Sequence, residues 1–505
     1  MDSYWHASRP APAPRSEAPV EGTHADTVVA GAGLTGLMTA LLLARAGQRV
    51  TVLEARTVGA VTTGRTTGKL SLLQGLVMSD ILRHHTEGVL RAYVEGNREG
   101  QAWLVRFMDE HLVAYQRRPA FTYATTAGGA ERLEAEFAAC RAGGLDVQRT
   151  TDTGLPFAVE AALMLPDQVQ LHPMLVMDAL VEDFVAHGGL LVEGVRLTDA
   201  HAGSPLKITT TRGNLTADRL VLATGSPVLD RGGYFAKLEP LRSYATTHRV
   251  PGGIPTGMYL SADDPTRSLR TVPDADGELL MVGGNGHVTG RSDSPAAAVD
   301  DLVRWTQERF PGAELTQAWS AQDYRSLNRV PFVGKLPRGG GAIYLATGFN
   351  KWGMSNAVAA GLNLSAQILG GSMPWADKLG HRVTKPAGVL SALAPNAKVA
   401  LVATRDWIGA ELHALPEQTP AEGQGVVGRG KKGLPEAVST VDGVTCRVSA
   451  VCTHLGGVLG WNDAEKSWDC PLHGSRFAAD GTLLEGPAVS DLPAHQPAEP
   501  GQPGA

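Results

Sequence analysis

The stretch Thr27-Val28-Val29-Ala30-Gly31-Ala32-Gly33-Leu34-Thr35-Gly36 decides the fold of the N-terminal region. Four residues of strand character are followed by a glycine turn and then by an apolar, helical pattern over Leu37–Arg45. The first glycine permits a tight turn, the second lets the backbone approach a pyrophosphate, and the third lets helix and strand pack closely. The N–H groups at the start of the helix attract phosphate. The stretch therefore predicts a dinucleotide-binding βαβ unit.

The residues after this helix complete the pattern. A second predicted strand, Arg49–Leu53, leads to Glu54, 18 residues after Gly36, where a carboxylate can accept hydrogen bonds from a ribose. Glu54-Ala55-Arg56 runs into a threonine- and glycine-rich segment that can surround a second phosphate and the flavin edge, Thr62-Thr63-Gly64-Arg65-Thr66-Thr67-Gly68-Lys69. No second complete fingerprint occurs in the sequence, so we expect one dinucleotide, and the segment favours FAD over NAD. A glycine turn without a nucleotide is the alternative.

Two later apolar runs end in small residues. The first ends in Ala223-Thr224-Gly225 and the second, Ile343–Thr347, ends at Gly348. Each lies where a parallel strand would deliver its loop to a ligand in an open α/β sheet. We therefore predict an α/β architecture over residues 25–376, with a Rossmann-like FAD-binding domain and an interleaved α+β substrate domain.

In order and type, these motifs resemble the FAD-dependent oxidoreductases of the D-amino-acid oxidase superfamily, which includes glycine oxidase and sarcosine oxidase. The resemblance covers about residues 24–376 and also rests on His172-Pro173, the strand Leu190–Val195 and the loop Gly348-Phe349-Asn350-Lys351-Trp352-Gly353-Met354. It implies that this loop lies against the flavin N1–C2=O edge, where Lys351 and the following helix would stabilise negative charge on reduced flavin. An ordinary solvated lysine is the alternative. Because the loop has no cysteine, we expect non-covalent FAD.

The C-terminal part of the chain contains a second motif, with three of the four cysteines within 25 residues. Cys452-Thr453-His454 is followed, after 15 residues, by Cys470-Pro471-Leu472-His473. One cysteine and one histidine in each loop are typical of a Rieske [2Fe–2S] cluster, with the cysteines on one iron and the histidines on the other. Zinc accepts the same ligands and is the alternative. The flanking residues resemble the Rieske family over roughly 411–495, which predicts a small all-β domain.

Composition limits the remaining possibilities. Hydrophobic residues make up 43% and charged residues 19% of the chain, and the net charge of −6 provides no basic footprint for nucleic acid. The uncharged stretch Val28–Ala44 is 17 residues long, but its glycines fit a strand–turn–helix better than a membrane span. Without a signal-peptide pattern, we expect a location in the cytoplasm. The predicted parts are a flexible N-terminal arm (1–24), the oxidoreductase region (25–376), a linker with a helix (377–410), the Rieske domain (411–495) and a tail (496–505).

Three further residues are candidates for substrate contact besides Lys351. His287 ends an apolar strand, Tyr244 follows the point where the strand of the family enters the substrate domain, and Arg325 stands beside Tyr324 before a Pro-Phe-Val-Gly turn. Packing in the core or on the surface is the alternative for each.

These features support the hypothesis of a flavin-dependent oxidoreductase. A small molecule, amine- or amino-acid-like, would give a hydride to FAD, and single electrons would pass to the Rieske cluster and on to an external one-electron carrier. One alternative is the reverse electron flow, in which the cluster feeds FAD for reduction or hydroxylation of a substrate. Another is an electron-transfer component that serves a partner enzyme.

The cluster is predicted to have a low reduction potential. High-potential Rieske proteins of respiratory chains carry an additional disulfide-bonded cysteine in each loop, but Gly457 and Leu472 occupy those positions here. We expect a midpoint nearer the lower end of the Rieske range of about −150 to +300 mV. A redox titration measures it, and a midpoint above about +200 mV would contradict the assignment.

Overall fold

The computed structural model describes residues 1–9, 20–382, 396–430 except 397, 400, 408, 411, 413 and 417, and 433–494. They form two compact units, one from Met1–Gly286 and Ala298–Leu393, the other from His287–Ala297 and Ala394–Ala505. Residues 401–407 are helical, inside the predicted linker. The predicted tail 496–505 and residues 383–395 of the linker lie outside the described residues.

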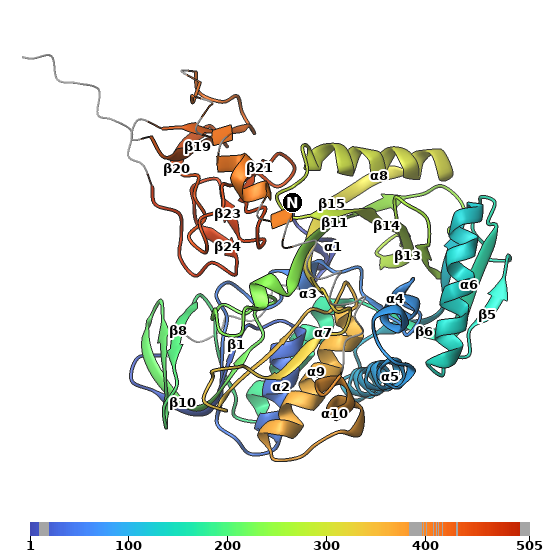
Figure 1. Ribbon diagram of the computed structural model, residues 1–505. Coiled ribbons are helices and arrows are strands. Elements are labelled where there is room, and N and C mark those ends of the chain that lie inside the picture. Colours follow the sequence, from blue (N-terminus) through green and yellow to red (C-terminus); the bar gives the residue numbers. More distant parts are fainter. Residues whose placement is uncertain are drawn as a thin grey trace, which may run out of the picture. The chain divides into compact units, whose positions relative to one another are not determined.

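A largely parallel sheet carries the glycine turn (Figure 1). Its order is β16-β17-β10-β1-β2-β7, with β9 and then β8 added beside β10. Strands β17, β10, β1, β2 and β7 run parallel, so their carboxyl ends meet at one edge. The strands are β1 (His24–Ala30), β2 (Val50–Leu53), β7 (Leu190–Val192), β8 (Leu197–His201), β9 (Leu206–Thr210), β10 (Gly213–Leu222), β16 (Phe332–Lys335) and β17 (Ile343–Thr347).

Three helices pack together beside this sheet. Helix α2 (Leu34–Arg45) contacts both α7 (Pro173–Ala186) and α9 (Gly353–Ile368), as Figure 1 shows. Gly361 allows the close approach of α9 to α2, because a Cβ there would lie 2.8 Å from the Cβ of Met38. The remaining helices are α1 (Tyr4–Ser8), α3 (Thr62–Arg65), α4 (Val77–His84), α5 (Glu87–Glu110), α6 (Ala127–Ala142), α8 (Pro295–Arg309), α10 (Pro374–Gly380) and the 3-10 helix η1 (Tyr234–Ala236).

A second, mainly antiparallel sheet forms the interleaved domain. Its order is β15-β11-β14-β13-β12-β4-β6-β3, with β5 paired to β6. Within the first unit the chain passes repeatedly between the two sheets, as expected for an interleaved substrate domain. The strands are β3 (Lys69–Leu70), β4 (Tyr115–Ala124), β5 (Gln148–Thr150), β6 (Ala161–Leu171), β11 (Leu238–Arg249), β12 (Met258–Ser261), β13 (Arg267–Asp274), β14 (Gly277–Val288) and β15 (Glu314–Ser326).

The C-terminal unit contains two small antiparallel sheets, β18-β19-β20 and β21-β22-β23-β24. The predicted fold class, an α/β region with an interleaved domain followed by a small all-β domain, is confirmed. The strands are β18 (Gly425–Arg429), β19 (Pro435–Val441), β20 (Val444–Ser449), β21 (Gly460–Asn462), β22 (Ser467–Asp469), β23 (Arg476–Ala478) and β24 (Leu483–Glu485).

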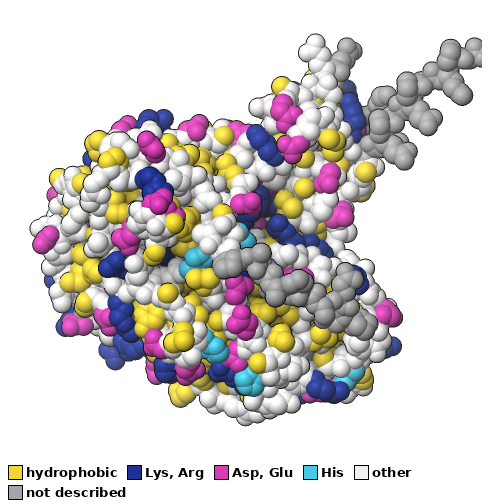
Figure 2. Space-filling view, turned by 180° about the vertical axis from the view of Figure 1, so that it is seen from behind, with side chains coloured by type: hydrophobic (Ala, Val, Ile, Leu, Met, Phe, Trp, Pro, Cys, Tyr) yellow, Lys and Arg dark blue, Asp and Glu magenta, His cyan; other side chains and the backbone are white. Residues whose placement is uncertain are grey.

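The surface carries charges of both signs. On the face shown in Figure 2, acidic and basic side chains are interspersed with apolar ones. Among the described residues, none of the helices combines the length and the apolar character that crossing a bilayer requires.

The structure of the first nine residues differs from the predicted flexible arm over 1–24. They include helix α1, in which Tyr4 and Trp5 are 7% and 1% exposed. The Trp5 ring lies against the ring of His172, with 4.9 Å between centroids. Burial of these two aromatic side chains gives the segment the apolar contact area that a loose arm lacks.

The buried ring of His172 predicts sensitivity to acid. His172 caps α7 by accepting a hydrogen bond from the Leu175 N–H at 3.3 Å, and burial lowers its pKa to about 4. A histidine in the unfolded chain titrates near 6.5, so protons favour the unfolded state below that pH. We expect the free energy of unfolding to fall by on the order of 2 kcal/mol between about pH 6.5 and 4.

Thermal melts over this pH range test the expectation against His172→Asn, which keeps a capping acceptor but does not titrate. The variant should lose less melting temperature on acidification than the parent protein. Equal losses would show that His172 is not the responsible group.

Candidate functional site

The glycine turn places a helix terminus directly at the end of β1. Gly31 has a φ of +104°, and a Cβ there would lie 2.5 Å from the carbonyl oxygen of Ala223. A Cβ at Gly36 would lie 1.9 Å from the Gly31 oxygen, so neither position accepts a side chain. No side chain caps α2 at Gly33, while the Leu34 N–H donates to the Thr63 hydroxyl at 3.1 Å. Helix N–H groups at this edge of the sheet fit the pyrophosphate of a dinucleotide.

Glu54 stands beside this turn. Its carboxylate accepts hydrogen bonds from the N–H groups of Ala32 and Arg56, both at 2.8 Å. Burial raises the pKa of Glu54, and these two N–H groups counteract the rise. The Val195 N–H donates to the Glu54 carbonyl oxygen at 2.9 Å, which places the predicted Val195 next to it. Two donors among the described residues hold this carboxylate, which leaves lone pairs for the hydroxyls of a ribose.

The ends of the other parallel strands meet the turn at the same edge. The Ala223 N–H donates to the Ala30 carbonyl oxygen at 2.9 Å, and the Thr347 hydroxyl donates to the carbonyl oxygen of Gly225. Gly225 and Gly348 have φ values of +76° and +81°, which favour glycine. The structure thus brings together the ends of β1, β10 and β17.

Lys69 ends the segment that the sequence predicts to surround the second phosphate and the flavin edge. Its ammonium donates to the Tyr259 carbonyl oxygen at 2.7 Å and to the Ser268 hydroxyl at 2.6 Å. Lys69 is 7% exposed, and burial holds its pKa well below the usual range. These contacts turn the side chain toward β12 and β13 of the second sheet, so its cofactor-binding role stays a prediction.

The loop between β17 and α9 has a strained backbone. Neighbouring residues Asn350 and Lys351 both lie in the left-handed region, with φ values of 50° and 67°. Such residues cost of order 1 kcal/mol each and occur often at functional sites. The Asn350 N–H donates to the Tyr324 carbonyl oxygen at 3.2 Å, and the Lys351 N–H donates to the Asp323 carboxylate. The Lys351 ammonium lies against Gly286, where a Cβ would be 2.6 Å from Nζ.

Charges around Lys351 are coupled. Crowding by protein atoms lowers the pKa of Lys351 even though solvent reaches its side chain, Asp323 raises it, and Arg325 lowers it. Burial raises the pKa of Asp323, whereas Lys351 and Arg325 lower it. Arg325 is itself paired with the Glu239 carboxylate. Mutual attraction therefore favours the charged forms of Lys351 and Asp323 against the effect of burial.

Asp323 is a site residue that the sequence interpretation missed. The sequence drew attention to Tyr324 and Arg325, but side chains at positions i and i+2 of a strand share a face. The alternation of side chains along a strand could have identified Asp323, because it places Asp323 on the same face as Arg325.

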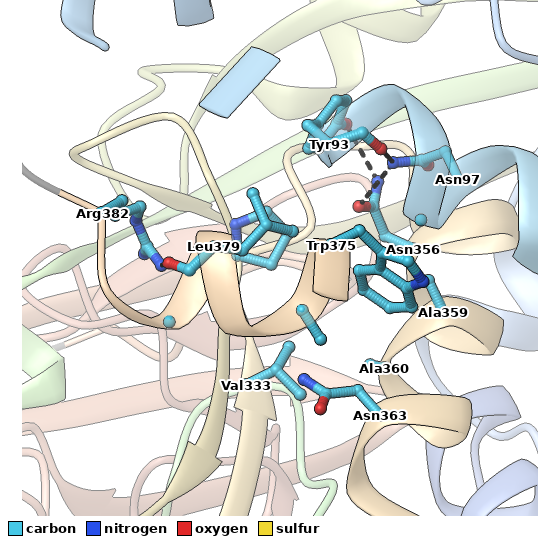
Figure 3. Close-up of a pocket in the computed structure, with 14 residues that line it drawn as sticks. Tyr93, Asn97, Val333, Asn356, Ala359, Ala360, Asn363, Trp375, Leu379 and Arg382 are labelled. Atoms are coloured by element: carbon cyan, nitrogen blue, oxygen red, sulfur yellow. Dashed lines mark hydrogen bonds between the residues drawn. The ribbon is translucent and has the colours of Figure 1, made fainter. Parts of the chain in front are cut away.

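A buried polar network adjoins the first turn of α9 (Figure 3). The Asn356 amide donates to the Tyr93 hydroxyl at 3.0 Å, and the Asn97 amide donates to Asn356 Oδ1 at 3.2 Å. The Ser355 hydroxyl donates to Asn97 Oδ1 at 2.6 Å. The network ties α9 to α5 and so fixes where α9 begins. The adjoining cavity, about 30 Å³ and lined in part by Trp375, has room for a water molecule rather than a flavin.

The four predicted catalytic residues have different surroundings in the structure. Asp323 links Lys351 and Arg325. Tyr244 is 1% exposed and belongs to a hydrophobic cluster, an environment that favours packing over the predicted substrate contact. His287 belongs to the second unit, with its Nδ1 3.0 Å from the Val288 carbonyl oxygen.

Two loops of the second unit have matching backbone hydrogen bonds. The Gly456 N–H donates to the Cys452 carbonyl oxygen at 3.0 Å, and the Gly474 N–H donates to that of Cys470 at 3.1 Å. The Cys452 N–H donates to the Gly457 carbonyl oxygen, and the Cys470 N–H donates to that of Ser475, both at 2.8 Å. Gly456 and Gly474 both lie in the left-handed region. Each Cys-X-His turn is thus closed in the same way.

The side chains of these loops fit a Cys₂His₂ centre. Cys452 and Cys470 are 3% and 2% exposed, and their hydrogen bond lowers the pKa of Cys452 to about 7. The His454 and His473 rings lie 5.2 Å apart at an interplanar angle of 87°. The Ser475 hydroxyl and loop N–H groups also hydrogen-bond to the Cys452 sulfur. A thiol pair beside an imidazole pair is the donor set of a Rieske cluster.

The two positions that distinguish high-potential Rieske proteins lie in contact. A Cβ at Gly457 would be 2.8 Å from the Leu472 Cδ1 and 3.0 Å from the Cys470 sulfur. Leu472 therefore occupies the space between the loops with apolar atoms.

An excess of negative charge surrounds Arg476, close to Cys470. Its guanidinium contacts the carboxylates of Glu465 at 2.8 Å, Asp469 at 3.0 Å and Glu485 at 3.8 Å. All four side chains are under 9% exposed, so solvent screens them weakly. Negative charge disfavours the addition of an electron, which supports the predicted low potential.

Both cluster loops are held from outside the predicted Rieske domain. The Trp407 indole donates to the Gly456 carbonyl oxygen at 3.0 Å, and Arg291 Nε donates to that of Pro471 at 2.9 Å. All four residues belong to the second unit. Sequence spacing around the ligands carries no signal for either donor.

Two models of known protein families match this chain. Residues 26–367 match the FAD dependent oxidoreductase family, and residues 419–496 match the Rieske [2Fe-2S] domain. The chain is thus an oxidoreductase with FAD and one [2Fe–2S] cluster as cofactors.

Individual relatives agree with this division. The Bacillus subtilis (strain 168) protein YhfW, which carries the name of a Rieske 2Fe-2S iron-sulfur protein, is 29% identical over 496 residues, 97% of each chain. Glycine oxidase from Geobacillus kaustophilus has a TM-score of 0.59 at 19% identity, covering 70% of this chain and 96% of that one. L-proline dehydrogenase from P. horikoshii has a TM-score of 0.60 at 16% identity, covering 72% and 97%. At these identities the two structures show a shared fold.

Substitution of one cluster ligand should remove the cluster alone. Cys470→Ser is expected to lose both iron atoms and the rhombic EPR signal of the reduced cluster, while FAD remains bound. Cys446→Ser is the matched control, because Cys446 lies on β20 opposite Ser439 and outside both loops. Iron analysis and EPR measure the result. Full iron content in Cys470→Ser would contradict the ligand assignment, and zinc in the parent protein would contradict the iron–sulfur cluster.

Proposed function

The chain belongs to the FAD-dependent oxidoreductase family and carries a Rieske [2Fe-2S] domain, and from this premise we propose that it oxidises a small amine- or amino-acid-like molecule. Electrons then leave through the cluster to an external one-electron carrier. One observation carries the proposal: a single chain combines the dinucleotide edge with a Cys₂His₂ donor set whose two cysteines are buried. The names of two proteins that share the fold, glycine oxidase and L-proline dehydrogenase, support a substrate with an amine nitrogen.

The residues of the first unit supply binding and charge. Bound FAD provides a hydride acceptor, and a [2Fe–2S] cluster carries single electrons. The N-terminus of α2 holds the pyrophosphate and Glu54 the ribose. Lys351 and the N-terminus of α9 place positive charge where negative charge develops on oxidation of the substrate. Burial lowers the pKa of Lys351, and the Asp323 carboxylate counteracts this effect and so favours the charged ammonium.

The electron count explains why two carriers share one chain. A neutral amine gives up a hydride, that is one proton and two electrons, and its C–N single bond becomes the C=N bond of an iminium cation. The electrons leave singly, so each turnover reduces two molecules of a one-electron acceptor and releases the proton to solvent. A two-electron donor and a one-electron acceptor are thereby matched.

An anaerobic screen of amines, amino acids and alcohols tests the proposal. We expect an amine or amino acid to bleach the flavin, and stopped-flow mixing to show flavin reduction before cluster reduction. Bleaching by alcohols alone would overturn the substrate class. Cluster reduction before flavin reduction would overturn the direction of electron flow.

Lys351→Met sharpens this experiment. Removing the ammonium should slow flavin bleaching at least tenfold, about 1.4 kcal/mol in the barrier. Lys335→Met, on β16 with an exposed side chain, is the matched control and should bleach at the rate of the parent protein. Equal rates of flavin bleaching in both variants would show that the Lys351 ammonium does not contribute to the reaction.

A further inference from the structure

The threonine- and glycine-rich segment 62–69, which begins with α3, is held by an unusual set of hydrogen bonds. Five consecutive carbonyl oxygens, of residues 64–68, each accept a hydrogen bond from a side chain of another element. The donors are Ser3 Oγ to Gly64 at 2.5 Å, Trp319 Nε1 to Arg65 at 2.8 Å, Trp5 Nε1 to Thr66 at 2.5 Å, and Arg270 Nη1 to Thr67 at 2.7 Å and Gly68 at 2.8 Å. The conformation of the segment therefore depends on side chains outside it.

The N-terminal residues contribute two of these donors and pack against the segment. Ser3 and Trp5 are 0% and 1% exposed. A Cβ at Gly64 would lie 2.3 Å from the His6 ring, so the helix and the segment are in direct contact. Arg65 returns a hydrogen bond to the Met1 carbonyl oxygen at 3.1 Å.

The opposite side of the segment reaches the dinucleotide turn. The Thr63 hydroxyl accepts the hydrogen bond from the Leu34 N–H, at the start of α2. The Gly59 N–H donates to the Ala32 carbonyl oxygen at 3.2 Å. In a trans peptide the N–H points opposite to the carbonyl oxygen, so donors that hold the carbonyls also orient the N–H groups.

We propose that the N-terminal helix α1 is a positioning element of the FAD site. By holding the carbonyl oxygens of Gly64 and Thr66, Ser3 and Trp5 preorganise the segment that faces the dinucleotide turn. Binding of FAD then costs less ordering of this segment. The inference rests on the FAD cofactor and is independent of the substrate and of the direction of electron flow.

FAD affinity of the full-length chain tests the proposal. Trp5→Phe keeps an aromatic ring but deletes the N–H donor to Thr66. Tyr4→Phe is the matched control on the same helix, since the Tyr4 hydroxyl donates to the Pro273 carbonyl oxygen of β13 at 2.6 Å and not to the segment. The flavin-depleted protein is titrated with FAD by flavin fluorescence, without substrate or acceptor. Melting temperatures are measured with and without FAD.

We expect Trp5→Phe to bind FAD about fivefold more weakly, as for the loss of one neutral hydrogen bond, and Tyr4→Phe to stay within about twofold of the parent protein. The stabilisation by FAD should shrink in Trp5→Phe only. If Trp5→Phe and Tyr4→Phe bound FAD with the same affinity, whether unchanged or weakened, α1 would have a purely structural role and the proposal would be overturned. If Trp5→Phe does not fold, Ser3→Ala decides in the same way, through the donor to Gly64.

Discussion

The approach of Gly36 to the carbonyl oxygen of Gly31 is the constraint on which the cofactor region depends. It lets α2 begin directly at the end of β1. A second close approach, at Gly361, packs α9 on α2 and thereby positions the loop that precedes α9. Two close contacts that require glycine, at Gly36 and Gly361, therefore relate the phosphate-binding end of the site to the Lys351 loop. A larger side chain at either contact would separate elements that the chemistry requires together.

The sequence predicted those parts of the structure that short-range spacing determines. The βαβ start, the small residues that end β10 and β17, and the two Cys-X-His turns each carry their signal within a few residues. The contacts of Lys69 and the packing of α1 were not predicted because their partners are remote. The ammonium of Lys69 is bound by groups 190 and 199 residues away, and Trp5 contacts a carbonyl 61 residues away. The amino-acid composition of a short stretch of sequence does not reveal partners that lie so far away along the chain.

The second unit shows the same division between ligands and their supports. Spacing identifies the two cysteines and two histidines, because the cluster dictates both the residue types and their loops. The donors that hold the loops, Trp407 and Arg291, come from the predicted linker and from the predicted oxidoreductase region. The carboxylates around Arg476 are likewise brought together by strand pairing. Properties of the centre that depend on charge and rigidity therefore arise from tertiary structure.

The donors that hold residues 64–68 have a consequence for how the chain is made. This segment leaves the ribosome early, but Arg270 and Trp319 follow it by 202 residues or more. Until they are synthesised, the carbonyl groups of Arg65, Thr67 and Gly68 lack partners that the native structure requires. High contact order of this kind slows folding and prolongs the exposure of incomplete structure. The flavin site, encoded at the beginning of the chain, is thus among the last parts of the first unit that can be completed.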